Sequence, residues 1–184
     1  MSIYLNEYVK LKDEQITRLR FRDNLLYATL VAFGGIISYM MSELGTSSEQ
    51  SHYFYYTFLV LPWVCLILGW TYLVNDEKIS AIGWYIRGSM TDKLGTLVGQ
   101  QSEPLLGWEI VHRDDNLRKP RKYFQLIIDE LTFVISGAAA LYIFWVMWPD
   151  PLSLFLWVIM GVEGTLLVLL GVWIFMYSDT EKGR

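Results

Sequence analysis

Four apolar runs in this sequence are each close to the length needed to cross a lipid bilayer. They occupy residues 25–42, 53–74, 125–148 and 152–177. A helix of roughly 20 mostly apolar residues spans the hydrocarbon core of a bilayer. A chain of 184 residues that is 53% hydrophobic is also too apolar for an ordinary soluble domain of this size. The sequence therefore predicts an all-α membrane protein with four transmembrane helices.

The positions of the basic residues predict the orientation of these helices. All 15 Lys and Arg residues lie in the N-terminal segment, in the segment 75–124 or in the C-terminal tail. The connections 43–52 and 149–151 contain no Lys or Arg. Because cytoplasmic loops carry an excess of Lys and Arg, we expect both termini and the middle segment to be cytoplasmic.

This topology divides the chain into five predicted parts. They are a cytoplasmic N-terminal helix (1–24), a first transmembrane hairpin (25–74), a cytoplasmic loop domain (75–124), a second hairpin (125–177) and a cytoplasmic tail (178–184). About fifty residues cannot form a large core alone. We therefore expect the N-terminal helix and the loop to build one small cytoplasmic helical layer together.

An apolar stripe in the N-terminal segment predicts how its helix packs. Leu5, Val9, Ile16 and Leu19 recur at helical spacing, with Lys12 breaking the series. The stripe is expected to pack on the middle loop or to pair with other copies of the chain. The alternative is a helix that lies in the lipid interface.

Glu163 is the one charged residue in the middle of an apolar run, and a carboxylate there is costly. A structural role would keep it protonated and hydrogen-bonded to Thr132, Ser136 or Thr165. A functional role would place it on a pore or transport path. The candidate pore or gate residues are Glu163, Leu156, Ile159, Leu167 and Leu170. The small residues expected to allow close helix packing are Thr132, Ser136, Ala140, Gly161 and Gly164.

A basic cluster in the middle segment is the candidate site for a ligand that carries phosphate. It consists of Arg113, Arg118, Lys119, Arg121 and Lys122, with Trp108 and His112 available to stack on a base. Basic residues beside a membrane span more commonly set topology and contact anionic lipid. Both interpretations stay open at this point.

The sequence contains no recognisable catalytic motif, so we expect no enzymatic activity, metal or cofactor. The two histidines, His52 and His112, fall on opposite predicted sides of the membrane. Cys65 has no partner for an intrachain disulfide. The carboxylates of Asp76, Glu77, Asp114 and Asp115 are expected to be solvated surface charges. Asp129 and Glu130, near the inner end of the third run, are expected to reach water or Lys122 and to stay charged.

Three short segments resemble a family of small bacterial integral membrane proteins of unknown function. They are 21–27 (FRDNLLY), 68–83 (LGWTYLVNDEKISAIG) and 107–110 (GWEI). This resemblance implies a location in the bacterial inner membrane but no active site. In plan the chain is also similar to the membrane effectors of nucleotide-signalled antiphage systems, which oligomerise and permeabilise the membrane.

The sequence therefore favours a homo-oligomeric effector or gated pore controlled from its cytoplasmic layer, with a nucleotide second messenger or a cytoplasmic protein as the trigger. No binding to duplex nucleic acid is expected. One alternative is a proton-coupled small-molecule transporter that uses Glu163, similar to the small multidrug transporters in its four spans and single embedded glutamate. The other alternative is a non-conducting scaffold.

Overall fold

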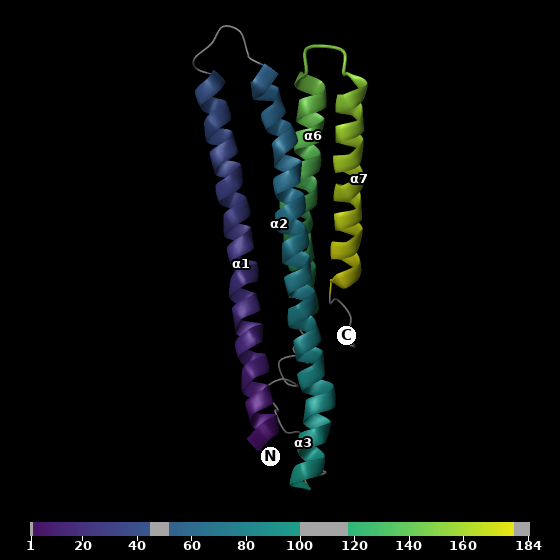
Figure 1. Ribbon diagram of the computed structural model, residues 1–184. Helices are drawn as coiled ribbons and strands as arrows, with labels where there is room; N and C mark the ends of the chain where they lie inside the picture. Colours follow the sequence, from purple (N-terminus) through teal and green to yellow (C-terminus); the bar gives the residue numbers. More distant parts are fainter. Residues whose placement is uncertain (1, 45–51, 100–117, 179–184) are drawn as a thin grey trace. The chain divides into compact units, whose positions relative to one another are not determined.

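The computed structural model describes residues 2–44, 52–99 and 118–178, and every regular element in these ranges is a helix (Figure 1). In chain order they are α1 (Ser2–Leu44), α2 (His52–Tyr85), η1 (Ile86–Met90), α3 (Thr91–Val98), α5 (Arg118–Asp129), η2 (Glu130–Ile135), α6 (Ser136–Met147) and α7 (Leu154–Tyr177). The two η elements are π-helical turns. The structure has four helical segments long and apolar enough to cross a membrane, which confirms the predicted all-α class and number of spans.

Two of these helices are much longer than a membrane span. Helix α1 has 43 residues and α2 has 34, and α2 continues through η1 into α3. The end of α3 is set by Gly99, whose φ of 68° is a left-handed conformation that favours glycine, and its N–H donates to the carbonyl of Gly95 at 3.1 Å.

The chain forms two compact units, which are described separately. The polar unit comprises Met1–Asp23, Val74–Gln125 and Ser178–Arg184, and the apolar unit comprises Asn24–Leu73 and Leu126–Tyr177. Helices α1 and α2 each contribute one part to each unit.

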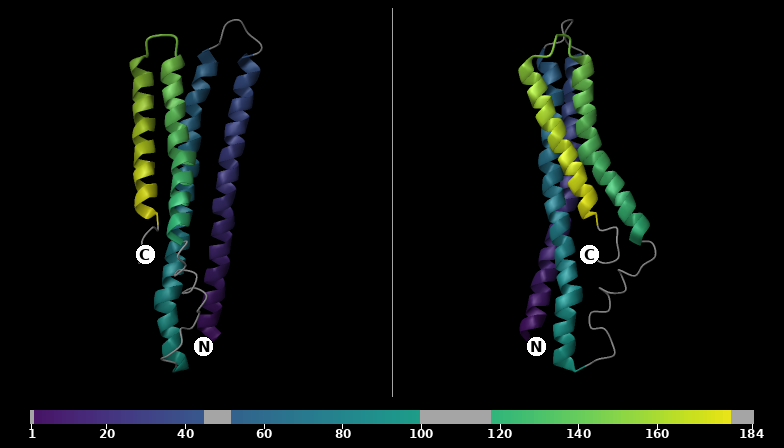
Figure 2. Two further views of the ribbon diagram at one scale, coloured as in Figure 1. Left: turned by 180° about the vertical axis from the view of Figure 1, so that it is seen from behind. Right: turned by 90° about the vertical axis from the view of Figure 1, so that its right-hand side faces the viewer.

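The core of the apolar unit receives side chains from all four of its helical segments. Leu25 comes from α1, Phe58 from α2, Phe133 from η2 and Leu170 from α7, and each is at most 8% exposed. Figure 2 shows the α6–α7 hairpin, with α6 in green and α7 in yellow. Many apolar side chains also face outward on these helices, as a lipid-facing surface requires.

Hydroxyl groups in the apolar unit are satisfied within their own helices. The hydroxyls of Thr29, Thr71 and Thr165 donate to the carbonyls of Leu25, Ile67 and Gly161, at 2.7 to 2.8 Å. This bond to the residue four positions earlier lets a helix carry threonine inside an apolar environment.

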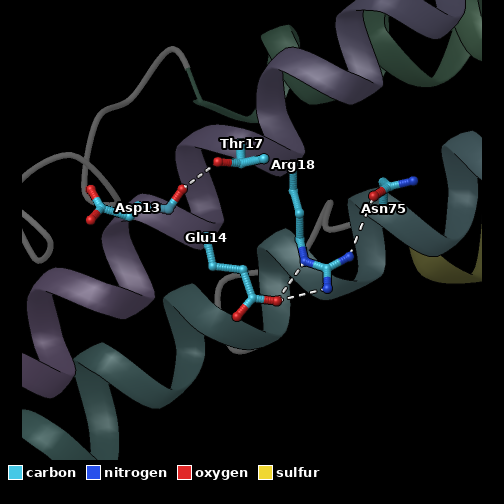
Figure 3. A network of polar contacts seen from close by, with 5 residues as sticks. All are labelled: Asp13, Glu14, Thr17, Arg18 and Asn75. Carbon is cyan, nitrogen blue, oxygen red and sulfur yellow. Dashed lines mark hydrogen bonds and ion pairs between the residues drawn. The ribbon is translucent and has the colours of Figure 1, made fainter.

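The polar unit is joined by side chains that reach from α1 to α2. Arg22 forms an ion pair with Asp76 at 2.7 Å, and both side chains are less than one-fifth exposed. Arg18 bonds to Glu14 on its own helix at 2.7 Å and reaches Asn75 on α2 at 3.4 Å (Figure 3). Asp76 is therefore not the solvated surface charge that its sequence context predicts.

Two more contacts extend this polar seam towards the start of α1. The Gln15 side chain donates to the carbonyl of Ile79 at 3.4 Å, and the Tyr85 hydroxyl donates to Glu7 at 2.8 Å. The predicted apolar stripe lies elsewhere, because Leu5, Val9 and Ile16 are 46% to 53% exposed. The described part of the middle segment therefore does not bury these three side chains, and residues 100–117 of that segment lie outside the described residues.

Candidate functional site

Helix α7 places Glu163 in the centre of the apolar unit. The helix is uninterrupted from Leu154 to Tyr177, and Leu156, Glu163, Leu167 and Leu170 recur on one buried face. The Glu163 side chain is 0% exposed. The sequence of α7 thus carries one ionisable carboxyl group into an otherwise hydrophobic core.

The carboxyl group of Glu163 lacks a hydrogen-bond partner. Among the described residues, neither oxygen finds a donor in acceptable geometry, although the side chain of Trp63 on α2 lies beside the group. The hydroxyls of Ser136 and Thr165 bond instead to the carbonyls of Leu131 and Gly161, at 2.6 and 2.7 Å. The expected hydrogen bonds from these two hydroxyls to Glu163 are therefore not present.

The leucines predicted as gate residues are firmly packed in one copy of the chain. Leu156, Leu167 and Leu170 are at most 5% exposed, whereas Ile159 is only half-buried. A Cβ added to Gly69 on α2 would lie 2.8 Å from Leu170, and one added to Gly137 on α6 would lie 2.9 Å from Leu167. Each of these two leucines therefore sits against a glycine of a neighbouring helix.

The predicted packing residues are only partly involved in close contacts within the chain. Ala140 is 4% exposed, and Thr132 and Ser136 are half-buried. A Cβ on Gly164 would just touch Leu141, at 4.0 Å, and one on Gly161 would have open space around it. Within one copy, Gly69 and Gly137 make the close helix approaches that the sequence assigned to Gly161 and Gly164.

The structure tests little of the predicted phosphate-binding cluster. Trp108, His112 and Arg113 lie outside the described residues, and the side chain of Arg118 is likewise not described. Lys119, Arg121 and Lys122 lie at the start of α5, in the polar unit, with Lys119 and Arg121 exposed.

Two acidic residues at the junction of α5 and η2 are more enclosed than the sequence indicates. Asp129 is buried at 6% exposure rather than open to water. Glu130 is half-buried, and its Oε2 would lie 3.1 Å from a Cβ on Gly171 of α7. Sequence reasoning missed this contact because it depends on which helices are neighbours. The one sequence feature that could have indicated this contact is Gly171, a glycine inside an apolar helix.

No other chemistry emerges from the described part of the chain. No three of its His, Cys, Asp and Glu side chains are grouped so that they could hold a metal ion. No protein-family model, curated protein or solved structure matches this sequence. The resemblance to small bacterial membrane proteins stays a prediction, and the function must be argued from the site itself.

Proposed function

We propose that this chain is a multi-pass protein of the bacterial inner membrane, with both termini cytoplasmic, which couples proton binding at Glu163 to the movement of a small solute. The observation that carries the proposal is the full burial of the Glu163 carboxyl group, with no hydrogen-bond partner for either oxygen among the described residues. The orientation follows from the distribution of Lys and Arg.

An unpaired carboxyl group in such a core is a poor structural element. Burying an unsatisfied polar group costs about 1–3 kcal/mol, and burying a charge costs more. Burial therefore favours the neutral, protonated form in this conformation. Intramembrane acids of this kind commonly belong to proton or ion pathways. A group that is neutral when enclosed and ionised when opened to water can bind and release a proton in a transport cycle.

The neighbourhood of the carboxyl group suggests which solutes it would accept. An ionised Glu163 would attract a cation, and the side chain of Trp63 beside it would lie close to that cation. A proton and an organic cation would then compete for the same carboxylate. This competition couples their movements, because the site cannot hold both.

Packing within one copy favours this mechanism over a pore formed between copies. Leu156, Leu167 and Leu170 are buried inside a single four-helix unit. They are therefore not exposed to line a channel between several subunits. A pore between copies would need other lining residues and a ring-sized assembly. Light scattering with correction for detergent measures the mass that separates these two proposals.

The first test asks whether Glu163 is protonated inside the apolar core. A hydrophobic carbodiimide reacts with protonated carboxyl groups, and mass spectrometry locates the adduct. We expect modification at Glu163 in proteoliposomes, with none at the exposed Glu77. Absence of the Glu163 adduct at every pH from 5 to 9, a range of roughly two units on either side of neutral, would remove the basis of the proposal.

The second test asks whether a cation displaces the proton. Tetraphenylphosphonium is added to weakly buffered, detergent-solubilised protein, and the released protons are measured with a pH dye. Wild type and the control Glu77→Gln should release protons, and Glu163→Gln should release none. Equal release from Glu163→Gln and wild type would contradict the assignment.

A further inference from the structure

Glu130 occupies an unusual place at the start of η2. A Cβ added to Gly171 of α7 would lie 3.1 Å from Oε2 of Glu130, which is a tight contact. The glycine at this position therefore leaves space for the Glu130 carboxyl group beside α7. Among the described residues, Glu130 has no hydrogen bond or ion pair to another side chain. The side chain is half-buried and packs against α7 at Gly171.

Gly171 and Glu163 lie on the same helix, so α7 connects the two carboxyl groups. Residues 163 and 171 are just over two turns apart, which is about 12 Å along the helix axis. Because Glu130 packs at Gly171, the two carboxyl groups are not within the hydrogen-bond reach that direct proton transfer requires. A proton passing between them must therefore travel through intervening water.

The interval between the two carboxyl groups contains Leu167 and Leu170. These side chains are 2% and 0% exposed, and they sit against Gly137 and Gly69. A Cβ at either glycine would collide with a leucine methyl group, so each leucine is in close contact with the neighbouring helix on that side. The two leucines therefore close the interval in the conformation described.

Few other titratable groups lie near this interval. Asp129 precedes Glu130 and is engaged in contacts of its own, and Cys65 lies beside Gly137, 3.5 Å from its added Cβ. Helix α6 carries no acidic or basic residue, and Glu163 is the only one in α7. Tyr72 packs on Phe133 with the ring centres 5.2 Å apart. The part of α2 in the apolar unit contributes no acidic or basic residue after His52.

The backbone at Glu130 also departs from a regular helix. Residues Glu130–Ile135 form a π-helical turn, and the Ser136 hydroxyl donates to the carbonyl of Leu131 at 2.6 Å, five residues earlier. Such turns inside α-helices are frequent at functional sites.

We infer that Glu130 is a second proton-binding group, through which protons reach Glu163, and that Leu167 and Leu170 form the gate between the two carboxyl groups. The inference rests on the proposed function of Glu163 and deepens it. When water replaces the leucines, an O–H bond breaks at Glu130 and one forms at Glu163 through the water chain. Glu130 then takes a proton from bulk water, and no other reactant is needed.

The test follows the protonation of Glu163 after a sudden drop in pH. Purified full-length protein in lipid nanodiscs is first equilibrated in alkaline buffer, so that Glu163 is ionised, and is then mixed with acid while time-resolved infrared spectroscopy records the new carboxylic acid C=O band. The part of the band that disappears in Glu163→Gln belongs to Glu163. If Glu163→Gln removes no part of the band, the proposed function fails and the inference fails with it.

With the band assigned, Glu130→Gln tests the inference separately. We expect the Glu163 band to reach its wild-type amplitude about a hundredfold more slowly, the lower end of the effect of losing a positioned proton-transfer group. A purely structural role for Glu130 would change the amplitude or the folding but not this rate. An unchanged rate would overturn the inference and leave the role of Glu163 intact.

Two glycine variants keep the inference testable if Glu130→Gln does not fold. Gly171→Ala places a methyl group against Glu130 and should also slow protonation of Glu163. Gly161→Ala changes the same helix at a position where the added Cβ meets open space. In this control variant Glu163 should be protonated at the wild-type rate. Equal rates in the two variants would contradict the proposed path.

Discussion

The two units of this chain treat buried ionisable groups in opposite ways. In the polar unit, Arg22 and Asp76 are both largely buried and pair at 2.7 Å. In the apolar unit, Glu163 is completely buried and neither oxygen has a hydrogen-bond partner among the described residues. A buried ion pair holds two helices together, whereas a buried carboxyl group without a partner makes its surroundings less stable. The unpaired group is the one on which the proposed function rests.

The largest expected effect comes from breaking the pair in the polar unit. Asp76→Ala leaves the Arg22 guanidinium buried without its carboxylate, and removing one partner of a buried pair costs about 3 kcal/mol or more. We expect a loss of about that size in the free energy of unfolding, measured by circular dichroism in mixed detergent micelles. Glu77→Ala, at an exposed neighbouring position, is the control. Equal stability of the two variants would show that the pair does not hold α1 to α2.

The next effect concerns the close packing of the apolar unit. Gly69→Ala places a Cβ 2.9 Å from the Cβ of Phe133, an atom that cannot rotate away. Overpacking of this kind costs about 1–3 kcal/mol. Gly161→Ala should be neutral or slightly stabilising because its Cβ meets nothing within 4 Å. The same unfolding measurement compares the two, and an equally small effect would mean that the helices separate easily at Gly69.

Replacing the unpaired carboxyl group should have the opposite sign. Glu163→Leu removes a buried group without a partner, so the free energy of unfolding should rise by about 1–2 kcal/mol. The same variant should lose cation-induced proton release. Loss of stability instead would indicate that Glu163 has a structural partner, and the contrast between the two units would disappear.

The smallest effect is expected on the exposed stripe of α1. Leu5 and Val9 are about half exposed, so Leu5→Ser with Val9→Ser should change the stability of one copy by less than about 0.5 kcal/mol per site. The mass by light scattering should also stay the same. A smaller mass in the double variant would show that this stripe joins copies of the chain, which was one of the expectations from sequence.

The helices could be predicted from sequence because their signal is local. A long apolar run must become a helix in a membrane whatever its neighbours are. Glu163 stands out for the same reason, since one carboxyl group in such a run has a cost that does not depend on the fold. Both features were visible before any packing was known.

The contacts between helices could not be predicted in this way. Gly69, Gly137 and Gly171 matter because of the particular leucine or glutamate that faces each of them. The apolar stripe of Leu5, Val9 and Ile16 did not indicate the contact between α1 and α2, because a pattern of apolar residues cannot identify a contact made by polar side chains. In the polar unit that contact is made by Gln15, Arg18 and Arg22. The partner of each residue is a property of the tertiary structure.

The threonine hydroxyls of the apolar unit have a consequence for ion selectivity. Thr29, Thr71 and Thr165 each donate their proton to a carbonyl of their own helix, so each hydroxyl group is held against the backbone of that helix. A metal cation needs several oxygen ligands to replace its water. A proton needs only one lone pair. Glu163 is the only acidic residue of α7, so under the proposed function its single carboxyl group suits a proton better than a sodium or potassium ion.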